Sequence, residues 1–129
     1  MTIYREVGIA RDADAVWDAV RDIGHAHLRL FPGVLTNVEL VPAGRIVTFA
    51  NGAVVREPTV DIDGERRRYA WTTEGGNTSH FNASLRVVAD GTGACRIEWT
   101  TDFLPSDLRT GIEPLVDAGV AALRAAFEN

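Results

Sequence analysis

The chain has 129 residues, of which 46% are hydrophobic and 24% charged, and its formal net charge is −5. This length suits one globular domain with its own core. The negative charge argues against a nucleic-acid partner and against an anionic membrane surface, since both attract basic faces. Cys95 is the single cysteine, so no disulfide can form within the chain. No membrane-length apolar run or secretory pattern is present, and we expect a cytoplasmic protein without membrane insertion.

Seven segments rich in β-branched and aromatic residues predict strands, at residues 2–9, 34–41, 45–49, 53–62, 67–73, 80–88 and 95–103. Turn sequences separate the later ones, namely Asn51-Gly52, Asp63-Gly64, Gly75-Gly76-Asn77 and Asp90-Gly91. Such pairs supply the positive φ angles that tight hairpins require. The pattern therefore indicates an antiparallel meander.

Three segments indicate helices instead. Residues 12–23 carry apolar side chains at helical spacing, with Asp12 at the capping position. A short helix or turn is expected over residues 24–31. Residues 106–127 predict one long C-terminal helix, and Pro114 indicates either that the regular helix begins near it or that the helix kinks there.

The expected architecture is thus α+β, with a six- to seven-stranded sheet covered by one long helix and two short helices after the first strand. A single helix covers such a sheet only if the sheet curls around it. The helix is rich in small residues, including Ala118, Gly119 and Ala122. Either it packs very closely on the sheet, or a cavity lies between them.

The order of these elements and four local sequences resemble the START-like, or helix-grip, superfamily (SRPBCC), in its polyketide cyclase/dehydrase-like branch. The sequences are "DADAVWDAVRD", "FPGV", "REPTVDIDGERRRYAW" and "FNASLRVVADGTGACRIEW". The resemblance covers nearly all of residues 1–129 and implies a single helix-grip domain with an internal ligand pocket. The chain departs from relatives that carry a basic residue in the third strand, because it has Val47-Thr48-Phe49 there and Arg45 is expected nearer the turn.

Glu57 is the leading candidate for chemistry. The resemblance implies that it faces the cavity, where apolar walls would raise its pKa and suit it to acid–base work. On strand parity alone it lies opposite Val54 and Val60 and could point outward, paired with Arg56 or with an arginine of a neighbouring strand. A buried tyrosine hydroxyl or indole N–H needs a partner, and Glu57 is a candidate across the hairpin for Tyr69 or Trp71. Glu57 and Tyr69 are the predicted catalytic pair.

The predicted ligand-binding residues are mostly aromatic or aliphatic: Trp71, Trp99, Thr101, Phe49, Phe81, Leu30, Phe31, Leu115 and Ala122. His80, His25 and His27 are candidates for the pocket mouth. Histidines two apart do not share a helix face, so no metal site is predicted. No phosphate loop, nucleophile elbow or dinucleotide fingerprint is present, and no cofactor is expected.

These features lead to a hypothesis with two alternatives. The leading hypothesis is a protein that binds a small hydrophobic ligand, aromatic or polyketide-like, and catalyses cofactor-free cyclisation or dehydration. The first alternative is a non-catalytic carrier or sensor of a small hydrophobic molecule or lipid. The second is a partner-binding regulator using an exposed apolar patch near Leu28, Leu30 and Phe31. We expect a monomer or homodimer with no nucleic-acid partner.

Overall fold

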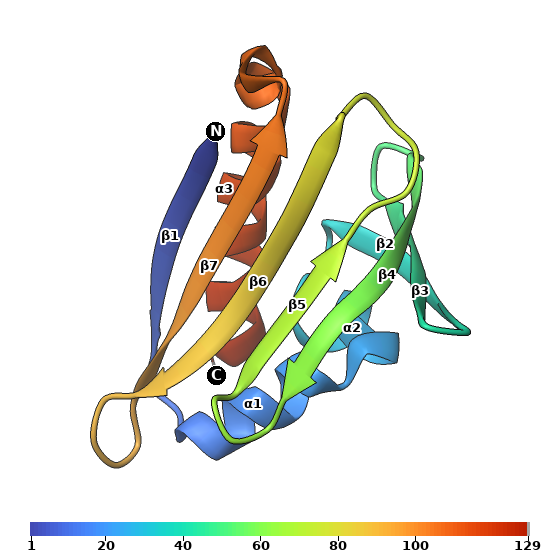
Figure 1. The fold of residues 1–129 in the computed structure, drawn as a ribbon. Coiled ribbons are helices and arrows are strands. Elements are labelled where there is room, and N and C mark those ends of the chain that lie inside the picture. Colours follow the sequence, from blue (N-terminus) through green and yellow to red (C-terminus); the bar gives the residue numbers. More distant parts are fainter. Residues whose placement is uncertain (129) are drawn as a thin grey trace.

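One antiparallel sheet forms the body of the molecule, in a computed structural model that describes residues 1–128 (Figure 1). Its seven strands lie in the order β1-β7-β6-β5-β4-β3-β2. Their bounds are β1 Thr2–Ile9, β2 Leu35–Val41, β3 Gly44–Phe49, β4 Val54–Asp63, β5 Arg68–Thr72, β6 His80–Ala89 and β7 Cys95–Leu104. β2 to β7 form a meander, and β1 pairs with β7 at one edge. The predicted strands are all confirmed, within one or two residues at each end.

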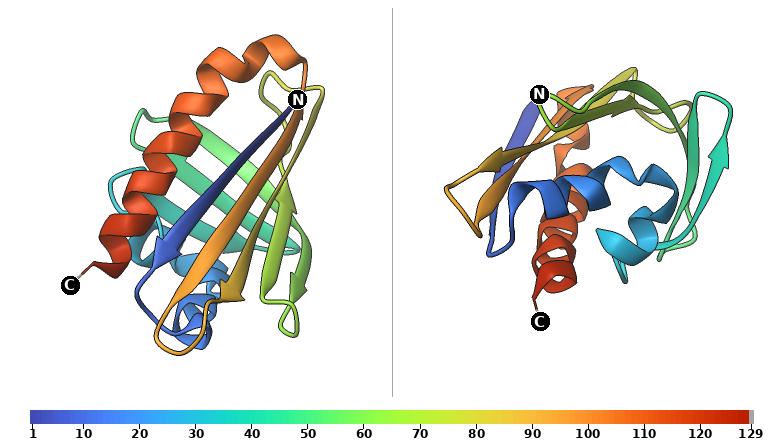
Figure 2. Two further views of the ribbon diagram at one scale, coloured as in Figure 1. Left: turned by 90° about the vertical axis from the view of Figure 1, so that its left-hand side faces the viewer. Right: turned by 90° about the horizontal axis from the view of Figure 1, so that it is seen from below.

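The helices lie on one side of this sheet. They are α1 Ala13–Arg21, α2 Ala26–Arg29 and α3 Arg109–Phe127, with short 3-10 turns at Ile23–His25 and Ser106–Leu108. The sheet curves around α3, and α1 and α2 close one end of its concave face (Figure 2). The helix-grip architecture predicted from the sequence is confirmed. Among the described residues, no helix combines the length and apolarity needed to cross a membrane.

One prediction about the helices is narrowed and another is wrong. α3 begins at Arg109 and includes Pro114, so of the two alternatives for this proline, a helix that begins near it is wrong. Asp12 does precede α1, but its side chain makes no capping hydrogen bond. Its carboxylate accepts a hydrogen bond from the Gly93 backbone N–H at 2.7 Å instead. Asp12 therefore ties the start of α1 to the β6–β7 turn.

The β4–β5 turn also differs from the simple Asp63-Gly64 turn expected. The Asp63 carboxylate accepts hydrogen bonds from the backbone N–H groups of Glu65 and Arg66, at 3.0 and 3.1 Å. This side-chain interaction extends the turn. The residue with positive φ is then Arg67, at 50°, while Gly52 and Gly91 have positive φ as predicted.

The end of the concave face beside α1 is filled. Val16 and Val20 of α1 are at most 1% exposed, and Leu85, Val87 and Ile97 of the sheet at most 2%. α1 contacts β6 and β7, which carry these sheet residues. Burying an aliphatic side chain of this kind stabilises the fold by roughly 1.5–3 kcal/mol. This end of the molecule is therefore a close-packed core.

β4 turns Glu57 inward. Glu57 is 7% exposed, whereas Val54 and Val60, of the opposite parity, are more than 60% exposed. The pairing register between β4 and β5 shifts between Thr59 and Asp61, so a bulge follows Glu57. The outward, solvated position that strand parity allowed for this carboxylate is not adopted.

Candidate ligand-binding site

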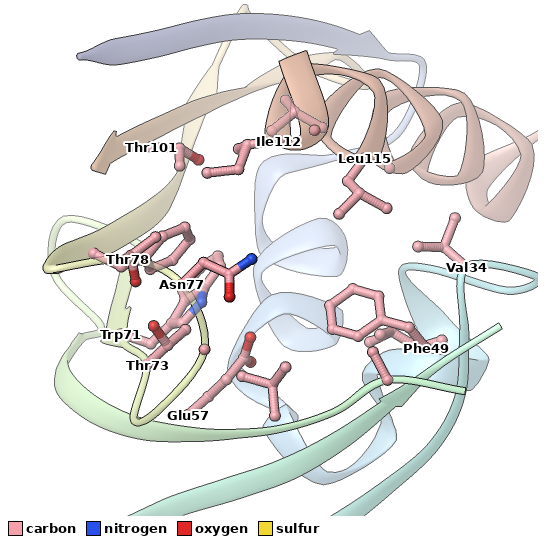
Figure 3. Close-up of a pocket in the computed structure, with 18 of the residues that line it drawn as sticks. Val34, Phe49, Glu57, Trp71, Thr73, Asn77, Thr78, Thr101, Ile112 and Leu115 are labelled. Carbon is pink, nitrogen blue, oxygen red and sulfur yellow. The ribbon is translucent and has the colours of Figure 1, made fainter. Parts of the chain in front are cut away.

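A cavity of about 440 Å³ lies between the first half of α3 and the concave face of the sheet. Figure 3 shows side chains from both sides pointing into it. Its lining residues are Phe31, Val34, Leu35, Arg45, Phe49, Asn51, Ala53, Val55, Glu57, Trp71, Thr73, Gly75, Gly76, Asn77, Thr78, Phe81, Trp99, Thr101, Leu108, Gly111, Ile112, Leu115, Val116 and Gly119. A mostly apolar wall with a few polar groups is typical of small-molecule sites.

Most residues selected from the sequence are brought together here. Those that line the cavity are Glu57, Trp71, Trp99, Thr101, Phe49, Phe81, Phe31 and Leu115. Three others, Tyr69, Leu30 and Ala122, are buried but do not line it. Any effect of these three on a ligand would therefore pass through neighbouring side chains.

The two charged side chains of the cavity form a buried ion pair. The Arg45 Nε donates to the Glu57 Oε1 at 2.9 Å, and the Arg45 side chain is only 3% exposed. Arg45 Nη1 also donates to the backbone carbonyl of Ile23 at 3.1 Å. The carbonyl belongs to the 3-10 turn after α1, so the guanidinium is held from two sides.

Arg45 was not among the site residues selected from the sequence. It lies beside the β2–β3 turn as expected, yet its side chain reaches the cavity. A two-residue turn at Asn51-Gly52 would have set Ile46 opposite Glu57, whereas the β3–β4 register sets Arg45 there. Arg45 also has the same strand parity as Val47, which is fully buried. A basic residue of β3 therefore does line this cavity.

Burial dominates the electrostatics of Glu57. Desolvation raises the pKa of its carboxyl above the ordinary glutamate value, and the charge of Arg45 opposes the rise. The Trp71 indole N–H also favours the carboxylate form and so lowers this pKa. Both side chains point into the cavity (Figure 3). Glu57 is thus an acid–base group presented to whatever occupies the space.

Tyr69 does not hydrogen-bond to Glu57 as the sequence suggested. Its ring stacks on Trp71, with centroids 5.1 Å apart, and the Arg45 guanidinium lies 5.2 Å from its centroid. Its hydroxyl has no hydrogen-bond partner among residues 1–128. Burial raises the pKa of this hydroxyl. Tyr69 therefore supports Trp71 and Arg45 from behind, outside the cavity.

Gly119 shapes the wall of the cavity that α3 forms. A Cβ at this position would lie 2.5 Å from the Trp99 ring, much closer than side-chain atoms approach. The missing side chain lets Trp99 lie flush under the helix, 5.5 Å from the Phe31 ring centroid. At this position, the small residue of the C-terminal helix therefore serves packing, although glycine disfavours a helix.

The loop between β5 and β6 supplies polar groups on one side of the cavity. Thr73, Asn77 and Thr78 point toward it from this loop and the adjoining strand end (Figure 3). The loop is tied to β4, because the Glu74 N–H donates to the Arg56 carbonyl at 3.0 Å and the two side chains form an ion pair.

The histidines take other positions. His80 contacts Asn82 at 2.7 Å and His25 contacts Asp22 at 2.8 Å. Neither these two nor His27 lines the cavity, so the predicted role at its mouth gains no support. In the described part of the chain, no group of three or more His, Cys, Asp or Glu side chains is arranged to hold a metal ion.

Residues 1–128 match the family model described as polyketide cyclase / dehydrase and lipid transport. The chain belongs to this family. Its helix-grip fold and cavity are consistent with that membership. No curated protein matches the chain significantly.

Solved structures share the fold at low sequence identity. An uncharacterised protein from Bacillus thuringiensis has a TM-score of 0.87 at 15% identity, over 98% of each chain. The di-domain ARO/CYC protein BexL, from the BE-7585A biosynthetic pathway, has a TM-score of 0.85 at 13% identity, over 98% of this chain and 46% of its own. A norcoclaurine synthase mutant from Thalictrum flavum has a TM-score of 0.73 at 25% identity, over 97% of this chain and 92% of its own.

Proposed function

We propose that this protein binds a small, mostly apolar molecule in the cavity under α3, with Glu57 as its polar anchor. The observation that carries the proposal is a buried carboxylate presented to an aromatic- and aliphatic-lined space of about 440 Å³. Drug-sized ligands occupy clefts of about 300–1,000 Å³. Membership in the polyketide cyclase / dehydrase and lipid transport family supports a role in binding hydrophobic molecules.

The aromatic side chains favour a ligand that contains a ring. Phe49, Trp71, Phe81 and Trp99 approach the space from four strands of the sheet, and Phe31 from the segment after α2. Flat aromatic walls contact a flat ligand over a large area, and stacked or edge-to-face pairs add to the apolar contact. An aromatic or polyketide-like molecule is therefore favoured over a flexible chain.

Acid–base catalysis at Glu57 is a second candidate function, favoured by its buried carboxylate beside an indole N–H. The carboxylate would take a proton from the carbon next to a ligand carbonyl. Returning the proton to a departing hydroxyl would release water, which completes a dehydration without a cofactor. The likeness to norcoclaurine synthase, solved with a transition-state analogue, supports this candidate. A non-catalytic carrier or sensor would use the same cavity.

Mass spectrometry of co-purifying molecules tests the binding proposal. The protein is purified from a cell extract, denatured and analysed for released small molecules, alongside Glu57→Gln and Glu39→Gln. Glu39 is an exposed glutamate of β2 outside the cavity, so its variant is the matched control. We expect an apolar compound with the wild type and the control, and much less with Glu57→Gln.

The same compound, added back to empty protein, separates the two functions. Conversion to a product by the wild type but not by Glu57→Gln supports catalysis, and recovery unchanged supports a carrier. Equal retention by wild type and Glu57→Gln would contradict the role of Glu57 as anchor.

A further inference from the structure

We propose that this cavity selects electrically neutral ligands, because Arg45 and Glu57 cancel each other's charge at its polar edge. The inference rests on the proposed binding function and narrows its ligand class. That class is an uncharged ring compound with hydroxyl or carbonyl groups along one edge and bare hydrocarbon along the other.

The charge balance comes from the lining itself. Arg45 and Glu57 are the only residues with a formal charge among those that line the cavity. Both are more than 90% buried, so water screens their interaction weakly. The formal charges of the walls therefore sum to zero, although the whole chain carries −5.

An ion entering this space would find no free counter-charge. The guanidinium donates through Nε to the Glu57 carboxylate and through Nη1 to the Ile23 carbonyl, so its charge is compensated by Glu57. An anionic ligand would bring a second negative charge beside Glu57, and a cationic ligand would face Arg45. In either case the ion loses its hydration without gaining a partner, which is costly at a buried site. A neutral molecule loses far less hydration.

The positions of the uncharged polar groups in the cavity favour a ligand with one polar edge and one apolar edge. Thr73, Asn77 and Thr78 lie on the same side of the cavity as Glu57, whereas Phe49 and Leu115 lie on the opposite side (Figure 3). Hydroxyl and amide groups can donate to or accept from ligand oxygens without adding charge. The polar side therefore suits hydroxyl or carbonyl groups, and the apolar side suits unsubstituted ring carbons.

Three probes of one shape test this inference at neutral pH: 2-naphthylmethanol, 2-naphthoate and 2-naphthylmethylammonium. Their binding to the wild-type protein is measured by calorimetry. We expect the alcohol to bind roughly tenfold or more tightly than either ion, given the cost of burying an uncompensated charge.

Variants at the ion pair sharpen the test. Arg45→Met leaves the carboxylate uncompensated and should shift the preference toward the ammonium probe. Glu57→Gln leaves the guanidinium uncompensated and should shift it toward naphthoate. Arg45→Lys keeps the charge balance and should keep the preference for the alcohol. A thermal melt of each variant verifies folding, and the wild-type ranking decides the matter if a single variant fails to fold.

The outcomes separate this inference from the proposed function. If the wild type binds either ion as tightly as the alcohol, charge selection is wrong while ligand binding stands. If the folded Arg45→Met and Glu57→Gln variants rank the probes as the wild type does, charge selection is likewise wrong. If none of the three probes binds, the proposed binding function itself is contradicted.

Discussion

The two ends of the concave face are built from the same strands but differ in how they are filled. At the α1 end, branched aliphatic side chains such as Val16 and Leu85 are at most 1% exposed, and neither lines the cavity. Under α3, the helix presents Gly119 to the Trp99 ring and Gly111 to open space, and about 440 Å³ stays open. Different helices cover the two ends. The difference shows that the covering helix, rather than the sheet, determines which end is packed as core and which end contains the cavity.

The two ends also differ in charge. The filled end is apolar. The hollow end contains Arg45 and Glu57, which form an ion pair, and Arg45 also donates a hydrogen bond to the Ile23 carbonyl. A buried ion pair costs desolvation that its mutual attraction only partly repays. The filled end therefore stabilises the fold. Part of that stability offsets the free-energy cost of burying the ion pair at the hollow end.

Breaking the ion pair should have the largest effect on the hollow end. Arg45→Met leaves the Glu57 carboxylate buried and unpaired, and we expect a loss of about 3–5 kcal/mol in the free energy of unfolding. Chemical denaturation measures it. The double variant Arg45→Met/Glu57→Gln removes both charges and should recover most of the loss. A single variant as stable as the wild type would contradict the tight pairing described above.

A matched pair of leucine truncations compares the two ends directly. Leu85→Ala, at the filled end, should cost about 2–5 kcal/mol because it opens a cavity in a close-packed core. Leu115→Ala, at the edge of the site, should cost under about 1 kcal/mol, because that side chain is 44% exposed. Denaturant unfolding of both variants under one set of conditions gives the comparison. Equal losses would mean that the hollow end is packed as a core.

Adding a methyl group to α3 at the hollow end should have a smaller effect on the free energy of unfolding. Gly119→Ala places a methyl group against the Trp99 ring, and overpacking of this kind costs roughly 1–3 kcal/mol. Better helix propensity returns up to about 1 kcal/mol. We expect a net loss near 1 kcal/mol and a shift in tryptophan fluorescence as Trp99 moves. A more stable variant with unchanged fluorescence would show that the added methyl group does not displace the Trp99 ring, and would contradict the expected overpacking.

The pH dependence of stability gives the smallest effect. Burial raises the pKa of Glu57, so the folded state binds this proton more readily than the unfolded state. Its contribution to stability is therefore present below the ordinary glutamate pKa and is lost as pH rises through the raised value. The stability of the wild type minus that of Arg45→Met/Glu57→Gln should fall as pH rises above the ordinary glutamate pKa. A difference that grows with pH would contradict this sign.

The strands and helices were predictable because the spacing of apolar residues in the sequence follows from which side chains are buried. The segment predicted at residues 95–103, for example, became β7 at Cys95–Leu104. The face of Glu57 was not predictable from parity alone, because either face of β4 carries aliphatic residues. Val55 shares its face with Glu57, while Val54 and Val60 lie on the exposed one.

The extent of the cavity was the least predictable feature. Parity grouped Tyr69 with Trp71, and both are buried, but only Trp71 reaches the cavity. Alternation tells which face of a strand a residue occupies, not how far along the strand a cavity extends. That limit depends on which helix covers each position, and the Arg45–Glu57 pair depends on strand register. Both are set by contacts between distant segments.

Gly44 has a consequence for how this protein can change over generations. Any side chain at Gly44 would collide with the backbone of Glu57 and Pro58 on the neighbouring strand β4. Apolar residues around the cavity, such as Ile112 or Leu115, can exchange for one another with little disturbance of the backbone. Divergence toward new ligands should therefore proceed through α3, while Gly44 stays invariant among descendants that keep the buried glutamate.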